Sequence, residues 1–189
     1  MEMNTATPPL PLQLIEEFIN TRRADGDGLA SREELEQWLT SRDLAPSSIS
    51  VNDSELSRAR AVREGLRAVI AENNAAPIAS PRPDGLNPSA RNEFAELAEN
   101  LPLVVDVRSS PPRLVPQAGL SDVDSALAAL LVGALAAVSD GTWVRLKACR
   151  EPSCRRAFYD HSRNRSRSWC SMELCGNRAK GRAFYSRNQ

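Results

Sequence analysis

The sequence lacks the features of an exported or membrane-spanning protein. No Lys or Arg precedes the apolar residues of the first segment, residues 1–14, so the charged region of a secretory signal is missing. The one long apolar run, residues 126–138, falls short of the roughly 20 apolar residues that cross a bilayer. We therefore expect a cytoplasmic protein with no membrane partner, in which residues 126–138 form a buried helix of the core.

Signatures of common enzymes are missing as well. Residues 1–144 contain no histidine, no G-x-S-x-G motif and no glycine-rich phosphate loop. We therefore predict that the protein is not an enzyme. An enzyme with its pocket in residues 1–144 is the alternative, and a small molecule bound tightly there would favour it.

Apolar residues at helical spacing dominate the first three quarters of the chain. They predict a helix from residue 10, another from Ser31, where Glu34 completes a capping box, and a long helix over residues 53–73 with one charged and one apolar side. Ser121 is the predicted N-cap of the apolar helix. The first part of the chain is therefore predicted to be helical.

Two β-branched runs, residues 103–107 and 113–116, predict a hairpin between the helices. The predicted fold class is mainly α with a small β-hairpin (α+β). We expect a helical N-terminal domain over residues 1–144, followed by a small C-terminal zinc-binding module over residues 145–189.

All four cysteines of the chain lie in that C-terminal segment. Four residues separate Cys149 from Cys154, fifteen separate the two pairs, and four separate Cys170 from Cys175. Two close pairs joined by a loop are the usual way to build a tetrahedral zinc site. Zinc would also supply folding energy to a segment with few core residues. The spacing therefore predicts a structural Zn²⁺ held by four cysteines.

The sequence supports other uses of the cysteines less well than a structural zinc site. Disulfides suit an even number of cysteines, but a cytoplasmic chain is kept reduced, and a redox dithiol favours a two-residue spacing. A catalytic zinc needs an open position and usually a mixed ligand set. The single histidine, His161, lies between the pairs, and we expect it at the surface or beside the site; three cysteines plus His161 is the competing ligand set.

Positive charge is concentrated in the same segment. Residues 145–189 contain twelve Lys and Arg against three Asp and Glu, a net charge of +9, so residues 1–144 carry −9 in a chain of zero net charge. Guanidinium groups and hydroxyls both donate to phosphate oxygens, and asparagine can pair with adenine. The predicted nucleic-acid-binding residues are Arg163, Asn164, Arg165, Arg167, Asn177, Arg178, Lys180 and Arg182. A solvated face, or docking onto the acidic N-terminal domain, is the alternative.

Residues 145–187 resemble the CGNR zinc finger. The resemblance rests on three motifs: Phe158-x-Asp160-x-Ser162-Arg-Asn164, Trp169-Cys-Ser-Met172 and Cys175-Gly-Asn-Arg178. The resemblance implies that the four cysteines bind zinc and that the module binds DNA. Residues 1–144 resemble, more weakly, the ABATE domain that usually precedes this finger and is proposed to be part of a stress-induced bacterial transcriptional regulator. Phe18-Ile-Asn20-Thr21 stands where a Leu-Leu-Asn-Thr is more usual.

Two hypotheses of function follow. The first is a bacterial transcriptional regulator that binds DNA through its finger, with the N-terminal domain as a small-molecule sensor or a homodimerisation unit. The second is a zinc-stabilised protein-interaction module that never meets nucleic acid. Binding to DNA that weakens steeply with salt separates them.

Overall fold

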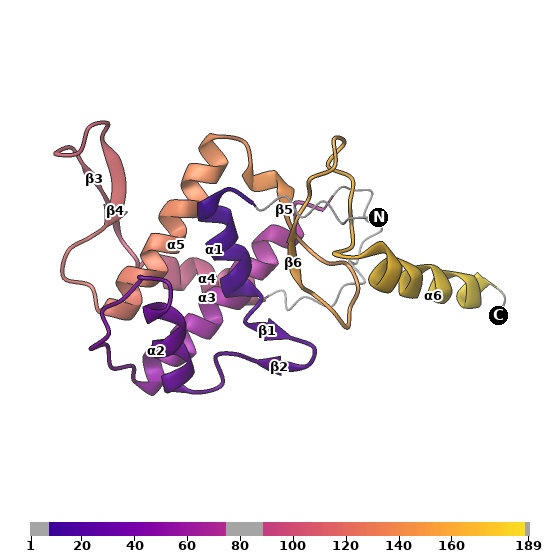
Figure 1. The fold of residues 1–189 in the computed structure, drawn as a ribbon, viewed down its shortest axis with the longest axis horizontal. Coiled ribbons are helices and arrows are strands. Elements are labelled where there is room, and N and C mark those ends of the chain that lie inside the picture. The colour runs from indigo at the N-terminus through magenta and orange to yellow at the C-terminus, as the bar shows by residue number, and fades with distance from the viewer. Residues whose placement is uncertain (1–7, 75–88, 188–189) are drawn as a thin grey trace.

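The computed structural model describes residues 8–74 and 89–187, in which the chain forms six α-helices and three two-stranded antiparallel ribbons (Figure 1). The helices are α1 (Leu10–Ile19), α2 (Arg32–Thr40), α3 (Asp53–Ala71), α4 (Ser89–Ala98), α5 (Asp122–Ser139) and α6 (Asn177–Arg187). The strands are β1 (Arg22–Arg23), β2 (Gly26–Asp27), β3 (Leu103–Asp106), β4 (Arg113–Pro116), β5 (Leu146–Ala148) and β6 (Ala157–Tyr159). The predicted fold class is confirmed, although it foresaw only the β3–β4 ribbon.

Helix starts follow local side-chain chemistry. Ser31 caps α2 and forms the predicted capping box with Glu34, and the Ser121 side chain accepts the first-turn amide of α5. A further capping box, between Asn52 and Glu55, begins α3. Each cap satisfies amides that have no partner inside the helix, so these boundaries are set by a few residues nearby in sequence.

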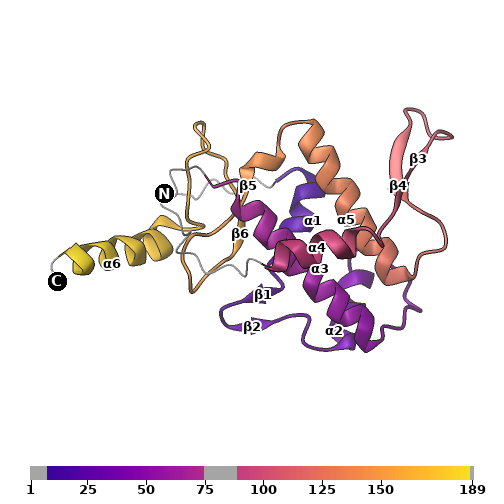
Figure 2. The same cartoon turned by 180° about the vertical axis from the view of Figure 1, so that it is seen from behind.

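The core lies where α1, α3 and α5 meet, with α4 covering α3 on the face shown in Figure 2. Gly65 of α3 lets α4 approach closely, because a Cβ atom there would lie 2.2 Å from Cβ of Phe94. Removing apolar area from water is the main stabilising term in such a core. Its largest fully buried apolar side chains are Phe18, Leu12, Ile15, Ile19, Leu29, Leu35, Leu39, Leu66, Ile70, Leu101 and Leu127.

The apolar helix α5 is a core helix on one side only. It packs against α1, α3 and β4, and buries Leu127 and Leu130, while Leu135 and Val138 are exposed. By length and composition it is the one helix of the described residues that could cross a membrane, a test that core helices of soluble proteins also pass. The prediction of a core helix is confirmed for its packed face, whereas its other face meets solvent.

Two arginines of α3 are buried. Arg63 and Arg67 are 2% and 3% exposed. Arg63 forms two hydrogen bonds with the Asp27 carboxylate, at 2.5 and 2.9 Å, and Arg67 donates to the carbonyl oxygen of Ile19. Buried guanidinium groups need such partners because desolvation of an unpaired charge is costly. The two arginines therefore tie α3 to the end of α1 and to the segment that follows it.

Candidate metal centre and basic surface

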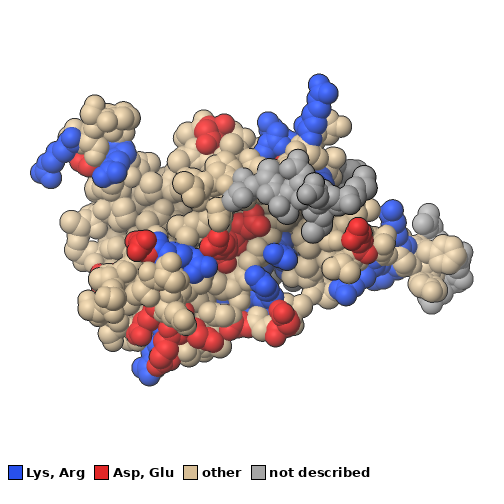
Figure 3. Space-filling model, viewed as in Figure 1, with Lys and Arg blue, Asp and Glu red and all other residues tan. Residues whose placement is uncertain are grey.

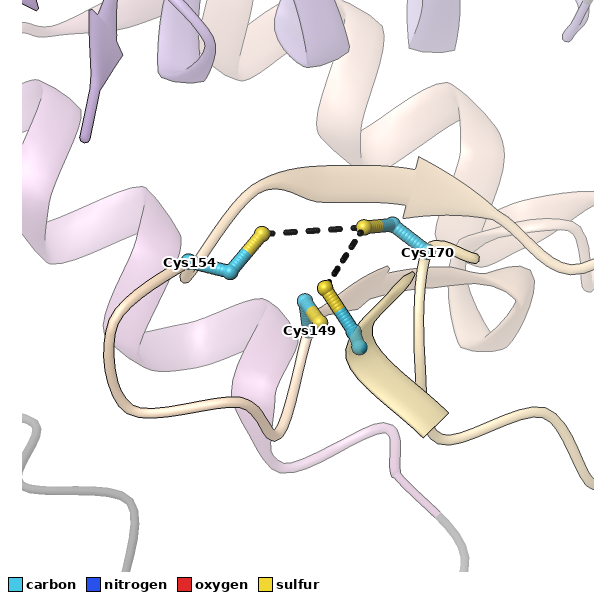
Figure 4. Close-up of side chains that lie close together, drawn as sticks. Cys149, Cys154 and Cys170 are labelled. Carbon is cyan, nitrogen blue, oxygen red and sulfur yellow. Dashed lines mark hydrogen bonds between the residues drawn. The ribbon is translucent and has the colours of Figure 1, made fainter. Parts of the chain in front are cut away.

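The four cysteines come from separate backbone segments and meet at one point. Cys149 follows β5, Cys154 lies in the turn before β6, Cys170 follows a long loop, and Cys175 lies in η2 (Met172–Gly176), the short helical turn before α6. All four sulfur atoms lie within 4.8 Å of one another. Figure 4 shows the labelled cysteines pointing into the same space. The chain thus brings together all four predicted ligands.

The sulfur spacing suits a tetrahedral metal ion. Sγ of Cys170 is 3.6 Å from Sγ of Cys154 and 3.7 Å from Sγ of Cys175. Four sulfurs at about 2.3 Å from a central zinc would be about 3.8 Å apart, whereas a disulfide needs about 2.05 Å. All four cysteines are unpaired. The donor set and its spacing therefore fit a structural zinc site and not a pair of disulfides.

The four thiols influence one another's ionisation. Hydrogen bonds with the Cys149 and Cys170 thiols lower the pKa of Cys154 to about 2, while hydrogen bonds to Cys149 and Cys154 raise the pKa of Cys170 above its usual range. Burial raises the pKa of Cys175 to about 12. Ionisation of one thiol thus makes ionisation of its neighbours less favourable. A divalent cation bound by all four would favour the thiolate form of each.

His161 lies outside this cluster. Its ring packs against Tyr159 with 4.7 Å between ring centroids, and the side chain is exposed. The group of possible metal ligands found among the described residues contains the four cysteines alone. The arrangement therefore favours the four-cysteine ligand set over three cysteines plus this histidine.

A buried ion pair supports the loop between the two cysteine pairs. Lys147 and Asp160 are both fully buried, with 2.8 Å between Nζ and Oδ2. Nζ also donates to the carbonyl oxygens of Arg165 (2.5 Å) and Arg167 (3.2 Å), and the carboxylate accepts the amides of Ser162 and Arg167. Burial opposes ionisation of Asp160, but these hydrogen bonds, led by that from Lys147, hold its pKa at about 2.

This network fixes the shape of the basic loop, residues 163–168, which projects at the top of the module in Figure 1. Arg163, Asn164 and Arg165 are exposed, and Arg165 has a left-handed backbone with φ of 50°. Arg167 is half-buried: it donates to the Cys170 carbonyl oxygen at 2.9 Å, and its guanidinium lies 5.3 Å from the centre of the Phe158 ring. The structure thus separates three outward-facing residues from one that supports the zinc site.

The remaining predicted nucleic-acid residues lie on α6, which projects from the body of the molecule (Figure 1). Arg178 and Lys180 are exposed. Asn177 is exposed too and donates to the Glu173 carbonyl oxygen at 2.9 Å. Arg182 binds Glu151 through two hydrogen bonds, at 3.0 and 2.6 Å, which hold the pKa of that carboxyl below its usual range. Figure 3 shows Lys and Arg on α6 and on the projection, and Asp and Glu gathered at the lower left, over α2.

The module is bonded to the N-terminal domain through three asparagine side chains that sequence reasoning did not single out as contacts. The Asn20 amide exchanges two hydrogen bonds with the backbone of Ala157, at 2.8 and 3.0 Å. Asn74 donates to the carbonyl oxygen of Ala148 (2.7 Å), and Asn73 to that of Leu146 (2.8 Å). Leu146, Ala148 and Ala157 are themselves part of the main hydrophobic core. The ribbon β5–β6 is therefore shared between the N-terminal core and the zinc site.

Glu16 marks the same junction, and it gives a prediction for pH. One carboxylate oxygen is buried without a hydrogen bond to the described residues, and burial raises the pKa to about 7 despite the nearby Arg156. A folded-state pKa above the unfolded value makes stability fall as pH rises from about 4.5 to 7. We expect Glu16→Gln to raise the free energy of unfolding by about 1–2 kcal/mol at pH 8 and to flatten this pH dependence.

Urea denaturation at several pH values, with excess zinc, measures this effect. Glu99→Gln, at an exposed position just after α4, is the matched control and should change little. An unchanged pH profile in Glu16→Gln would show that the pKa of Glu16 is the same in the folded and unfolded protein.

Fold and site together define a zinc-finger protein whose finger packs directly on a helical domain. The model for the family described as "CGNR zinc finger" matches residues 145–188, and that described as "Putative stress-induced transcription regulator", the ABATE family, matches residues 12–141. The chain therefore belongs to the ABATE family and carries a CGNR zinc finger at its C-terminal end. No curated protein matches it in sequence.

Proposed function

We propose that this protein is a cytoplasmic transcriptional regulator that binds DNA through the basic loop and α6, and that it acts without catalysis. The observation that carries the proposal is the placement of four exposed cations, Arg163, Arg165, Arg178 and Lys180, on backbone held by the zinc site and the Lys147–Asp160 pair. Preorganised cations lose little conformational freedom when they meet phosphates, and each phosphate contact releases counterions. The family description supports a regulator, and DNA is the partner we propose for it.

Replacing Arg163, Arg165 and Arg178 together with alanine tests this function. If each contacts a phosphate, the slope of log affinity against log salt should become shallower by about three, and affinity near 0.1 M salt should fall by roughly two to three orders of magnitude. Fluorescence anisotropy with a labelled random-sequence duplex measures both quantities.

The matched control removes three arginines elsewhere, at Arg23, Arg108 and Arg113, all exposed in the N-terminal domain. It changes the net charge by the same amount and should leave the slope intact. Equal losses in both triple variants would mean that overall charge, and not the proposed surface, governs binding.

A protein-interaction module is the second candidate, and the exposed apolar side chains around α6 favour it. Leu174, Phe184 and Tyr185 are 63%, 59% and 70% exposed. Such residues commonly anchor protein partners. No salt-dependent DNA binding by the zinc-loaded protein would favour this candidate.

The N-terminal domain is predicted to regulate the protein in one of two ways. It would bind a small-molecule effector, or it would form a homodimer. A shallow pocket of about 330 Å³ between α3 and α4 offers one place for a small polar molecule. Its lining residues are Ser57, Arg60, Ala61, Glu64, Ala68, Ala90 and Glu93. Thermal-shift screening tests the effector, and sedimentation equilibrium tests the dimer.

A further inference from the structure

Arg182 differs from the exposed cations of the basic surface because its guanidinium is paired with a buried carboxylate, that of Glu151. The Glu151 side chain is 2% exposed, and both of its carboxylate oxygens accept hydrogen bonds from Arg182, at 3.0 and 2.6 Å. Ser153 Oγ also donates to Oε1, at 3.0 Å. A two-point contact between planar groups restricts direction as well as distance. The guanidinium of Arg182 is therefore already engaged before any partner arrives.

The pair joins the two halves of the zinc site. Glu151 lies in the turn between Cys149 and Cys154, and its carbonyl oxygen accepts the amides of Cys154 (2.9 Å) and Arg155 (3.2 Å). Arg182 lies on α6, seven residues beyond Cys175. Zinc at Cys175 would hold the start of α6, and the ion pair provides a second attachment further along the helix. Two attachments set the direction of a helix, whereas one leaves it free to pivot.

Direction matters here because α6 projects from the rest of the protein (Figures 1 and 2). Side chains on an α-helix reach about 5–6 Å from its axis, so a pivot of about 20° at the start of α6 would move the charged ends of Arg178 and Lys180 by roughly 2–3 Å. A displacement of that size separates a cation from a phosphate. We infer, on the basis of the proposed DNA-binding function, that Arg182 is a positioning residue that Glu151 holds so that Arg178 and Lys180 face the DNA backbone.

The positioning role of Arg182 predicts a change of DNA affinity that the change of net charge alone does not. Glu151→Gln removes a negative charge, so electrostatics alone predicts tighter DNA binding, whereas Arg182→Gln removes a positive charge and predicts weaker binding. If the pair positions α6, both substitutions weaken binding, because each releases the helix. The two variants thus separate a phosphate contact by Arg182 from a positioning role.

The experiment compares the full-length, zinc-loaded protein with Glu151→Gln, Arg182→Gln and the charge-exchanged Glu151→Arg/Arg182→Glu, which keeps the net charge. Affinity for a random-sequence duplex is measured over a range of salt concentrations. We expect each single variant to bind roughly five- to tenfold more weakly, with the same change of salt slope in both, and the exchanged pair to recover most of the loss. Zinc content should be unchanged throughout. Tighter binding by Glu151→Gln, or a slope that becomes shallower by about one in Arg182→Gln but not in Glu151→Gln, would overturn the positioning role.

A second measurement needs no DNA. Hydrogen exchange of the α6 amides should be faster in both single variants than in the unaltered protein, because a helix held only at its start frays more readily. Unchanged protection in both single variants would overturn the inference. This test does not depend on whether the charge-exchanged variant folds. If the unaltered protein shows no DNA binding, the proposed function fails, while hydrogen exchange still decides whether the pair fixes α6.

Discussion

Cys170→Ser and Cys175→Ser are each expected to abolish stoichiometric zinc binding. The four sulfurs lie within 4.8 Å of one another, and each ligand contributes to a site that neutralises several thiolates at once. Structural zinc sites of this type have apparent binding free energies of about 10–16 kcal/mol, and the small cluster of Cys149, Phe158 and Cys175 offers little apolar burial to replace it. The loops that carry the cysteines, and the start of α6, should therefore lose their ordered structure in both variants, while Ala157 of β6 keeps its contacts with the N-terminal core.

Metal content by mass spectrometry, with thiols titrated in parallel, checks this result. The unaltered protein should contain about one zinc per chain and the two variants should contain almost none. Ser166→Ala, at an exposed position in the basic loop, is the control and should retain the metal. One zinc per chain in both cysteine variants would rule out the four-cysteine site.

Lys147→Met is expected to lower the free energy of unfolding by about 3–5 kcal/mol. The substitution leaves the Asp160 carboxylate buried without its cation, and leaves the carbonyl oxygens of Arg165 and Arg167 without their donor. Lysine suits the position because one ammonium has three donors and three oxygens surround it. Lys147→Arg should therefore also destabilise, since a planar guanidinium does not match that arrangement.

Chemical denaturation monitored by circular dichroism measures the loss. The second lysine of the chain, Lys180, is exposed, and Lys180→Met should change stability by no more than about 0.5 kcal/mol. Lys147→Met/Asp160→Asn should lose less than the sum of the two single variants, because the double variant has no unpaired buried charge. Strict additivity would show that the two groups do not interact.

Features that depend on residues close in sequence were predictable. The Ser31 capping box and the Ser121 cap involve partners only three residues away, and the spacing of the cysteine pairs indicated their convergence. Long-range partners were not predictable in the same way. The burial of Arg63 and Arg67 is an example, because the sequence does not reveal that Asp27 and the Ile19 carbonyl oxygen will lie beside them.

The basic surface was likewise predictable in part. Its existence follows from the concentration of arginine in the C-terminal segment, yet sequence gave no means of separating outward cations from supporting ones. In the sequence, Arg167 and Arg182 cannot be distinguished from the exposed arginines. In the structure, Arg167 contacts the Cys170 carbonyl oxygen and Arg182 contacts Glu151. Tertiary structure decides which cations remain available to a partner.

The asparagine contacts at the junction also close an otherwise open β-ribbon. A two-stranded ribbon has two free edges, and a free edge can add a strand from another chain. Asn20 occupies both backbone groups of Ala157 on the β6 edge, while Asn73 and Asn74 occupy carbonyl oxygens of β5. Side-chain amides thus complete the ribbon as neighbouring strands would. The contacts that attach the finger to the helical domain also protect it from edge-to-edge aggregation.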